Sequence, residues 1–262
     1  MDKIHALIGE HLIQITSNNI DFATSIFNEN KFLIPRHEHQ LPLLRIHIEK
    51  GYGVPFVDYQ VKVTKEKGKI YFQRADYLIE TDEEYTVSTV FAHNQLALKH
   101  ALTNLYSSYI VYHNWGLLIH SSCVIEEERA HIFAGQSGAG KSTAAKLSHP
   151  RLLLSDEATL IKITPNEITV FDSPFRSEIK STGLIKSSSL ASVQLLHQSL
   201  ENNRAQMSKS DGFLHLMDKI FYWAHDPSET KKIVGLLEIL INEVPIYNLY
   251  FQKNNIFWEL IS

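Results

Sequence analysis

A run of glycines followed by lysine and serine has the clearest chemical meaning in this sequence. The segment Gly135-Gln136-Ser137-Gly138-Ala139-Gly140-Lys141-Ser142 fits the pattern G-x-x-x-x-G-K-[ST] without a gap. Its glycines allow a tight turn whose backbone N–H groups point at phosphate oxygens, and a following helix adds partial positive charge. The lysine is placed to bridge the β- and γ-phosphates, and the serine hydroxyl to bind Mg²⁺. We therefore predict that residues 135–143, up to Thr143, bind a nucleotide.

Two carboxylates follow an apolar stretch shortly after this loop. Residues 152–155 (LLLS) predict a buried strand, and Asp156 and Glu157 stand at its end. Such a pair beside a phosphate loop can hold Mg²⁺ or polarise an attacking hydroxyl. Fifteen positions separate Asp156 from Lys141, which leaves room for one short helix. The alternative, a strand that ends in solvated acids, stays open.

His120 and Arg176 are two further candidates. His120 ends a predicted strand over 117–119, one strand before the loop, where its imidazole could contact phosphate or tune a base. Arg176 closes the segment Asp172-Ser173-Pro174-Phe175-Arg176 and could stabilise charge on a transferred phosphoryl group. A structural histidine and a surface turn are the alternatives.

The elements that must position these residues follow from local patterns. Residues 130–134 (AHIFA) predict a buried strand before the loop, and residues 142–147 the start of a helix. Further helices are predicted over Thr89–Tyr109, Val193–Gln198, Gly212–Trp223 and Ser228–Ile241, and a closing strand over Val244–Phe251. The Ser- and Lys-rich segment 177–192 predicts a loop that could close over substrate or be disordered.

The first 87 residues predict a β-rich region without a chemical motif. Apolar and polar residues alternate over 43–49, 59–64 and 70–73, and the charged run 65–69 with its glycine predicts a hairpin turn. We expect an α/β or α+β fold with a mixed sheet, divided into a β-rich region (1–87) and a catalytic domain (88–262). An open strand edge in the first region could accept an extended peptide.

Composition excludes several classes of protein. The 262 residues are 44% hydrophobic and 21% charged, with a net charge of −4, so disorder is not the main state. This charge gives no general attraction to nucleic acid or anionic membranes, and the single Cys123 cannot form an internal disulfide. The uncharged stretch 101–125 is interrupted by polar residues and predicts a buried helix end followed by a buried strand. With no signal-peptide pattern, we expect a soluble, cytoplasmic protein. His37 and His39 lack the spacing of a zinc site.

Together, His120, the phosphate loop and Ser155-Asp156-Glu157 resemble the catalytic core of the HPr kinase/phosphorylase superfamily. The closing residues 244–249 (VPIYNL) resemble the last strand of its shorter members, and the layout resembles the lasso-peptide precursor kinases, which phosphorylate a C-terminal Ser. The resemblance covers residues 115–260. It implies a core related to phosphoenolpyruvate carboxykinase, ATP and Mg²⁺ as cofactors, and Asp156 as the base that deprotonates the acceptor hydroxyl. The family's aspartate pair is Asp156-Glu157 here, and the segment that binds HPr is not recognisable after Arg176.

The resemblance and the residues lead to one main hypothesis and three alternatives. The main hypothesis is a serine kinase that acts on a precursor peptide or small protein, with Lys141 on ATP, and Ser142, Asp156 and Glu157 on Mg²⁺. An HPr-type kinase/phosphorylase, a nucleotide-binding regulatory module and a small-molecule kinase remain open. The purine preference and the assembly into a homo-oligomer also stay open.

Overall fold

The computed structural model describes residues 3–35 and 40–261, so the predictions for His37 and His39 lie outside the described residues. The chain forms two compact units. The first comprises residues up to 113 together with 222–229, and the second comprises 114–221 and 230 onward. The expected division after residue 87 falls inside strand β8 of the first unit.

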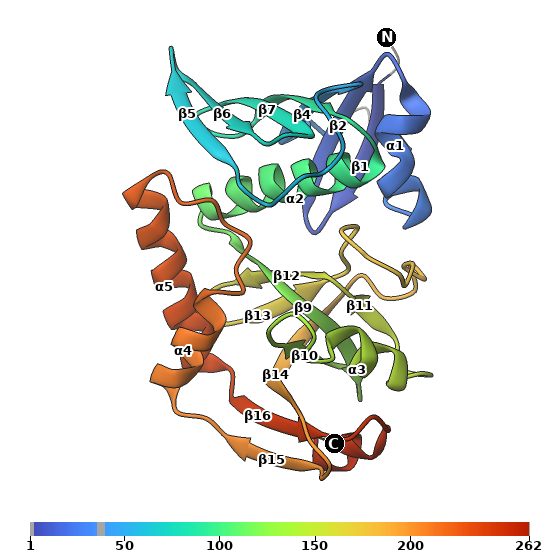
Figure 1. Ribbon diagram of the computed structural model, residues 1–262, viewed down its shortest axis with the longest axis vertical. Helices are drawn as coiled ribbons and strands as arrows, with labels where there is room; N and C mark the ends of the chain where they lie inside the picture. Colours follow the sequence, from blue (N-terminus) through green and yellow to red (C-terminus); the bar gives the residue numbers. More distant parts are fainter. Residues whose placement is uncertain (1–2, 36–39, 262) are drawn as a thin grey trace. The chain divides into compact units, whose positions relative to one another are not determined.

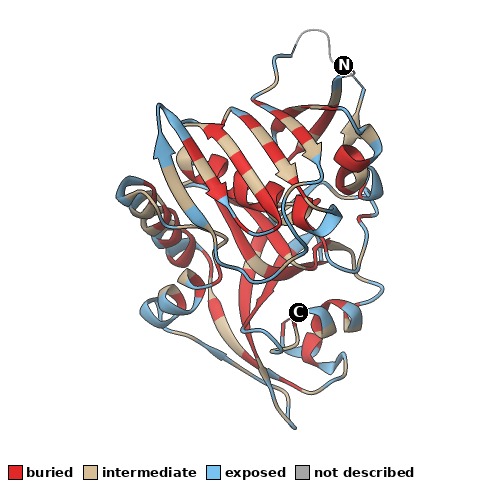
Figure 2. Cartoon of the chain, turned by 45° about the horizontal axis from the view of Figure 1, so that its top comes forward, coloured by how far each residue is buried: buried red, intermediate tan, exposed pale blue. Residues whose placement is uncertain are grey.

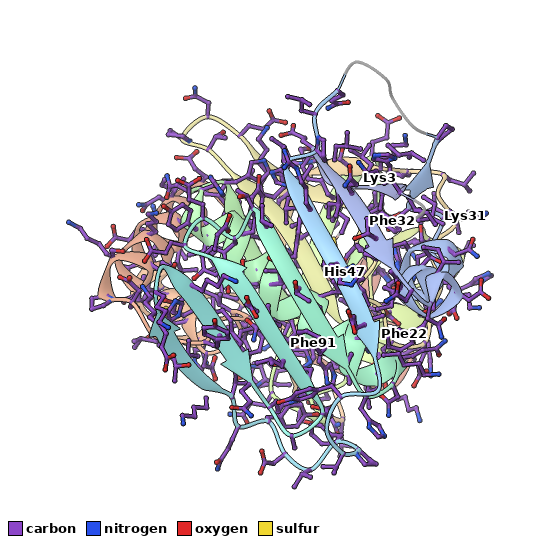
Figure 3. The ribbon with its side chains drawn as sticks, turned by 90° about the horizontal axis from the view of Figure 1, so that it is seen from above. Lys3, Phe22, Lys31, Phe32, His47 and Phe91 are labelled. Atoms are coloured by element: carbon purple, nitrogen blue, oxygen red, sulfur yellow. The ribbon has the colours of Figure 1, made fainter. Side chains whose placement is uncertain are left out.

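A mixed sheet with the strand order β3-β1-β2-β4-β8-β7-β6-β5 forms the first unit (Figure 1). Along β4, buried Leu44, Ile46 and Ile48 alternate with more exposed residues, as the period of a strand requires. Figure 2 shows this alternation along the sheet, and Figure 3 labels His47 and Phe91 on the more exposed positions of β4 and β8. The predicted hairpin turn is confirmed, with its positive φ angles at Lys67 and Gly68. The strands are β1 (Lys3–Ile8), β2 (His11–Ser17), β3 (Leu33–Ile34), β4 (Leu44–Lys50), β5 (Lys62–Glu66), β6 (Lys69–Gln73), β7 (Tyr77–Asp82) and β8 (Val87–Ala92).

Two helices, α1 (Ile20–Glu29) and α2 (Gln95–Tyr112), pack on this sheet and on each other. The predicted start of the second helix at Thr89 is wrong, because residues 89–92 belong to β8. There Ser88, Val90 and Ala92 are buried with a period of two, and the β-branched residues favour a strand. The side chain of Asn94 accepts a hydrogen bond from the Ala97 N–H and sets the actual start of α2.

Two long strands, β9 (Gly116–Glu126) and β14 (Ser187–Gln198), organise the second unit. The first part of β9 pairs with β12 (Ala158–Ile163), and its second part with β10 (Arg129–Ala134) and β11 (Leu153–Ser155). The hairpin partner of β12 is β13 (Ile168–Phe171). Because α2 runs into β9 with nearly all of both elements buried, the prediction for residues 101–125 is confirmed. Among the described residues, no helix combines the length and the apolar character that crossing a membrane requires.

The sheet that carries the phosphate loop is mixed. β14 lies between β10 and β16 (Ile246–Phe251) and is parallel to both, whereas β9 and β10 are antiparallel. The predicted helix over Val193–Gln198 is therefore wrong. Residues 192–196 are all buried, because strands flank them on both sides. A strand in this position lacks the alternation of apolar and polar residues by which a strand is predicted from sequence. The mixed α/β class predicted from the sequence is confirmed.

Short helices and the C-terminal residues complete the second unit. Trp258 and Phe257 pack against Phe133 and Ala144 in one buried cluster, which fixes the helix after the phosphate loop. The predicted helix over Gly212–Trp223 is shorter, because Asp218 ends it and Ile220 then bridges to Ile119 of β9. The remaining elements are α3 (Lys141–Leu147), α4 (Lys209–Met217), α5 (Pro227–Glu243), which begins in the first unit, β15 (Asn203–Gln206) and the 3₁₀ helix η1 (Ile256–Leu260).

Candidate functional site

The phosphate-binding pattern lies between a buried strand and a helix, as predicted. Strand β10 leads into residues 135–140, and α3 begins at Lys141. Gly138 and Gly140 have φ angles of 80° and 110°, a region that side chains rarely adopt. A Cβ atom on Gly140 would also lie 2.7 Å from Cζ of Phe251. The glycines are therefore required by the backbone of this loop.

The core behind α3 holds the loop in place. Ala144 packs in the buried cluster that contains Phe133 and Trp258. The Trp258 indole donates a hydrogen bond to Ser148 Oγ at the end of α3, with a distance of 3.0 Å. At the start of the helix, Ser122 Oγ of β9 donates to the Lys141 carbonyl at 3.1 Å. Contacts at both ends of α3 thus fix the position of the loop on the sheet.

The Lys141 side chain lies beneath the loop. Its ammonium donates to the carbonyls of Gly135 and Gln136, at 3.0 and 3.1 Å, and only 9% of the residue is exposed. Burial lowers the pKa of Lys141, and the positive charge of Lys219 lowers it further. Ser142 is exposed on the first turn of α3.

His120 lies near two lysines. Burial lowers the pKa of His120 to about 4, and the charges of Lys141 and Lys219 contribute to the shift. The imidazole is consequently neutral at pH 7. Its backbone N–H donates to the Lys219 carbonyl at 2.7 Å, and its ring lies 5.6 Å from that of Phe221, centroid to centroid. The structure therefore brings His120 and Lys141 together, as the sequence predicts, and adds Lys219.

Lys219 was missed at the level of the sequence. It lies beyond α4, far from the loop along the chain, and no local motif marks it. Together with His215 it lines a hollow of about 380 Å³ beside residues 135–139 and 195–198. We call this space the loop hollow. A second space of about 650 Å³, the Thr143 hollow, is lined by Gly140, Thr143 and residues 198–200 and 251–253.

The main chain at the two predicted acids is joined to the start of α3 through β9. The Ser121 N–H donates to the Glu157 carbonyl at 3.1 Å, and the next residue, Ser122, contacts Lys141. Asp156 is 4% exposed, and its carboxylate accepts three backbone N–H groups, from Ser177 (3.0 Å), Glu178 (2.8 Å) and Ile179 (2.8 Å). Both oxygens of Asp156 therefore have partners in this conformation.

Arg176 is buried in the segment that supplies those N–H groups. Its guanidinium donates to the carbonyls of Ser173, Ile179 and Leu153 at 2.9–3.1 Å, and to Asp172 Oδ1 at 2.5 Å. Burial raises the pKa of Asp172, and the charge of Arg176 opposes this rise. These contacts give Arg176 a positioning role in the segment 172–181. The loop predicted over 177–192 is confirmed as far as residue 186 and wrong beyond it, because residues 187–192 belong to β14 and pair there with β10 and β13.

The described residues contain no preformed cluster of metal-binding side chains. In the described part of the chain, no three His, Cys, Asp or Glu side chains converge on a common metal position. Mg²⁺ commonly takes one or two carboxylates and completes its shell with water and substrate phosphates. Ser142 on α3 and the acid pair after β11 supply oxygen atoms of the kind that Mg²⁺ binds, although both oxygens of Asp156 accept N–H groups in this conformation.

Comparisons with known proteins find similarity among solved structures. No protein-family model matches the chain, and no curated protein is similar to it. Among solved structures, the Hpr(Ser) kinase/phosphatase from Coxiella burnetii is similar over 55% of this chain and 90% of its own. The sequence identity is 10% and the TM-score is 0.31, which is too low to support an argument about either fold or function. The fold and the site by themselves define a mixed α/β protein with a phosphate-loop geometry.

Proposed function

We propose that this protein is an ATP-dependent kinase that transfers a phosphoryl group to a serine hydroxyl of a peptide. The observation that supports the proposal is that two neighbouring residues of β9 contact both parts of the predicted site: Ser122 contacts the Lys141 carbonyl after the phosphate loop, and Ser121 contacts the Glu157 carbonyl. The acceptor that we propose is the C-terminal Ser of a lasso-peptide precursor. That choice rests on the closing residues 244–249, which resemble the last strand of the superfamily's shorter members, and on the layout of the chain, which resembles the precursor kinases.

The residues have separate tasks in this proposal. Residues 135–143 hold the phosphates, and the Lys141 ammonium exchanges its two carbonyl partners for phosphate oxygens. Ser142 and a carboxylate of the acid pair would hold Mg²⁺, which would supply positive charge against the phosphates. Asp156 takes the proton from the acceptor hydroxyl as its oxygen bonds to the γ-phosphorus and the bond to ADP breaks. Catalysis comes mainly from positioning and electrostatics.

The nucleoside has a place beside the loop. The Thr143 hollow begins at Gly140 and Thr143, where the phosphate loop ends, and its volume of about 650 Å³ suits a small-molecule ligand. The Phe251 ring lies against Gly140 and provides an apolar surface. The phosphate loop contacts phosphates and does not distinguish adenine from guanine, so both ATP and GTP are tested as phosphoryl donors.

The acceptor peptide is proposed to pair with the first unit. Strand β5 (Lys62–Glu66) stands at the end of its sheet, and an extended peptide can add to such an edge through backbone hydrogen bonds. Hydrogen exchange of residues 62–66, with and without peptide, tests this pairing. Protection of their N–H groups by the peptide supports it, and unchanged exchange at saturating peptide contradicts it.

A nucleotide-binding regulatory module is the second candidate, and one observation favours it. The carboxylate of Asp156 is already bound by the N–H groups of residues 177–179, and a general base must have an oxygen available to the acceptor hydroxyl. A kinase therefore requires the segment 177–179 to withdraw when substrate binds. A module that only binds ATP, or hydrolyses it slowly, does not require this movement of residues 177–179.

An intact-mass assay distinguishes these functions. The full chain, Mg²⁺ and either ATP or GTP are incubated with a Ser-terminated precursor peptide, the same peptide ending in Ala, or the HPr protein. Lys141→Ala is the blank. A phosphoryl mass gain on the Ser peptide alone supports the precursor kinase, and gain on HPr replaces it with an HPr-type kinase. Nucleotide binding without gain on any acceptor overturns the peptide kinase and favours the module.

A further inference from the structure

The backbone around Lys219 is fixed against the strand that carries His120. The Lys219 carbonyl accepts the His120 N–H at 2.7 Å, and its own N–H donates to the Leu216 carbonyl at 2.9 Å. On the next residue, Ile220 bridges to Ile119 of β9. Lys219 is therefore held at one position beside the phosphate loop by main-chain contacts.

The side chain of Lys219 is unusually buried for a lysine. The residue is 8% exposed, and its ammonium donates to Asp218 Oδ2 at 2.6 Å. The Asp218 side chain is 63% exposed, and an ion pair with so solvated a partner contributes little to stability. The pair alone therefore does not account for the cost of burying a charged ammonium.

The loop hollow gives this lysine a chemical context. Lys219 lines it together with residues 135–139, the same backbone beneath which the Lys141 ammonium lies. Two buried ammonium groups beside one loop repel each other, and Lys219 accordingly lowers the pKa of Lys141. The single exposed carboxylate of Asp218 cannot balance both charges. A polyphosphate in the hollow would balance them.

We propose that Lys219 is a second phosphate-binding residue, which holds the phosphates of the nucleotide from the α4 side while Lys141 holds them from the loop. Asp218 is the partner of the Lys219 ammonium in this conformation, and it competes with phosphate for that ammonium. This inference rests on the nucleotide binding of the proposed function and does not require phosphoryl transfer.

The test is calorimetric binding of ATP and of inorganic tripolyphosphate, which has no base, to the full chain. Lys219→Gln is expected to weaken binding of both ligands about tenfold, because a charge-assisted contact is lost, whereas Lys219→Arg retains most of it. Asp218→Asn is expected to tighten tripolyphosphate binding about threefold, because it removes the competing carboxylate. Lys209→Gln, the same change at an exposed lysine of α4, leaves both affinities unchanged.

The two substitutions at Lys219 and Asp218 are expected to change the phosphate affinity in opposite directions. Damage to the fold would weaken binding in both, so the comparison distinguishes a binding role from such damage. Unchanged affinity in Lys219→Gln overturns the inference, and so does equal weakening in Lys219→Gln and Asp218→Asn. Should the wild-type chain bind neither ligand, the proposed function fails together with the inference. If ATP binding depends on Lys219 but no acceptor is phosphorylated, the inference is supported and the kinase is rejected. If Lys219→Gln binds ATP with wild-type affinity and still transfers the phosphoryl group, the kinase is supported and the inference is rejected.

Discussion

The guanidinium of Arg176 and the carboxylate of Asp172 form a buried ion pair at 2.5 Å, four residues apart in the chain. The other oxygen of Asp172 accepts the hydroxyl of Ser181, and Arg176 also donates to the Ile179 carbonyl. The pair thus joins the two ends of the segment 172–181. With the ends joined, residues 177–179 present their N–H groups to Asp156. The pair acts on the candidate base through this segment.

Removal of Arg176 should therefore destabilise the protein. Arg176→Ala leaves the Asp172 carboxylate buried without its cation, and we expect a loss of about 3–5 kcal/mol in the free energy of unfolding. Urea unfolding measures this loss. Lys146→Ala is the matched control, because it breaks an exposed ion pair with Glu178 of the same segment and should cost less than about 1 kcal/mol. Equal losses in the two variants would contradict the positioning role of Arg176.

The phosphate loop could be predicted from the sequence because its chemistry is local. Strand β10, the glycines and Lys141 are contiguous, and the backbone needs positive φ angles at Gly138 and Gly140. The helix predicted over 193–198 was wrong because burial between two strands removes the alternation that reveals a strand. Lys219 and the partners of Asp156 were inaccessible for another reason. They reach the site through the tertiary fold, from segments that carry no motif of their own.

Gly140 offers a test of the loop geometry. Gly140→Ala places a Cβ atom at a φ angle of 110° and against the Phe251 ring, so we expect destabilisation of at least about 1 kcal/mol and loss of measurable ATP binding. Gly235→Ala in α5 is the control, because its Cβ meets no atom within 4 Å and helix propensity should stabilise the protein by about 0.5–1 kcal/mol. Thermal unfolding and calorimetry give both values. Normal ATP affinity in Gly140→Ala would show that this glycine is not needed for the phosphate site.

The stability of the fold should fall with acidification because of two histidines. Burial lowers the pKa values of His120 and His131 to about 4, and positive neighbours contribute, chiefly Lys141 for His120 and Arg204 for His131. In the unfolded chain both histidines have their ordinary pKa of 6.5, whereas in the folded chain they become protonated only as the pH approaches 4. The unfolded state therefore takes up more protons in this window, and the free energy of unfolding decreases from pH 6.5 to pH 4.

Substitution of one histidine isolates its part of this pH dependence. His131→Gln removes an imidazole of β10 whose Nδ1 lies 2.8 Å from Ser192 Oγ, and it should flatten the decline between pH 6.5 and pH 4. Above about pH 7.5, where the unfolded histidines are neutral as well, neither histidine contributes a slope, so the two stability curves should run parallel there. Urea unfolding at half-unit pH steps provides the curves. An unchanged slope below pH 6.5 in His131→Gln would show that this histidine is not the source.

Asp156 decides between a kinase and a binding module. Asp156→Asn keeps the shape of the side chain but removes the base, and as a kinase the protein should lose phosphoryl transfer by about 10²–10⁴-fold while its ATP affinity is preserved. The amide offers one acceptor oxygen to three N–H donors, so a loss of about 1–3 kcal/mol in stability is expected in either case and cannot discriminate. Glu157→Gln removes the neighbouring carboxylate, a proposed Mg²⁺ ligand, and leaves the Asp156 contacts in place, so a higher Mg²⁺ concentration should restore its transfer rate but not that of Asp156→Asn. Transfer rates at several Mg²⁺ concentrations, ATP affinity and urea unfolding are measured on the same preparations. A rate lost in Asp156→Asn at every Mg²⁺ concentration and restored by Mg²⁺ in Glu157→Gln assigns the base to Asp156, whereas a stability loss with no change in ATP turnover leaves Asp156 a structural acceptor and the protein a nucleotide-binding module.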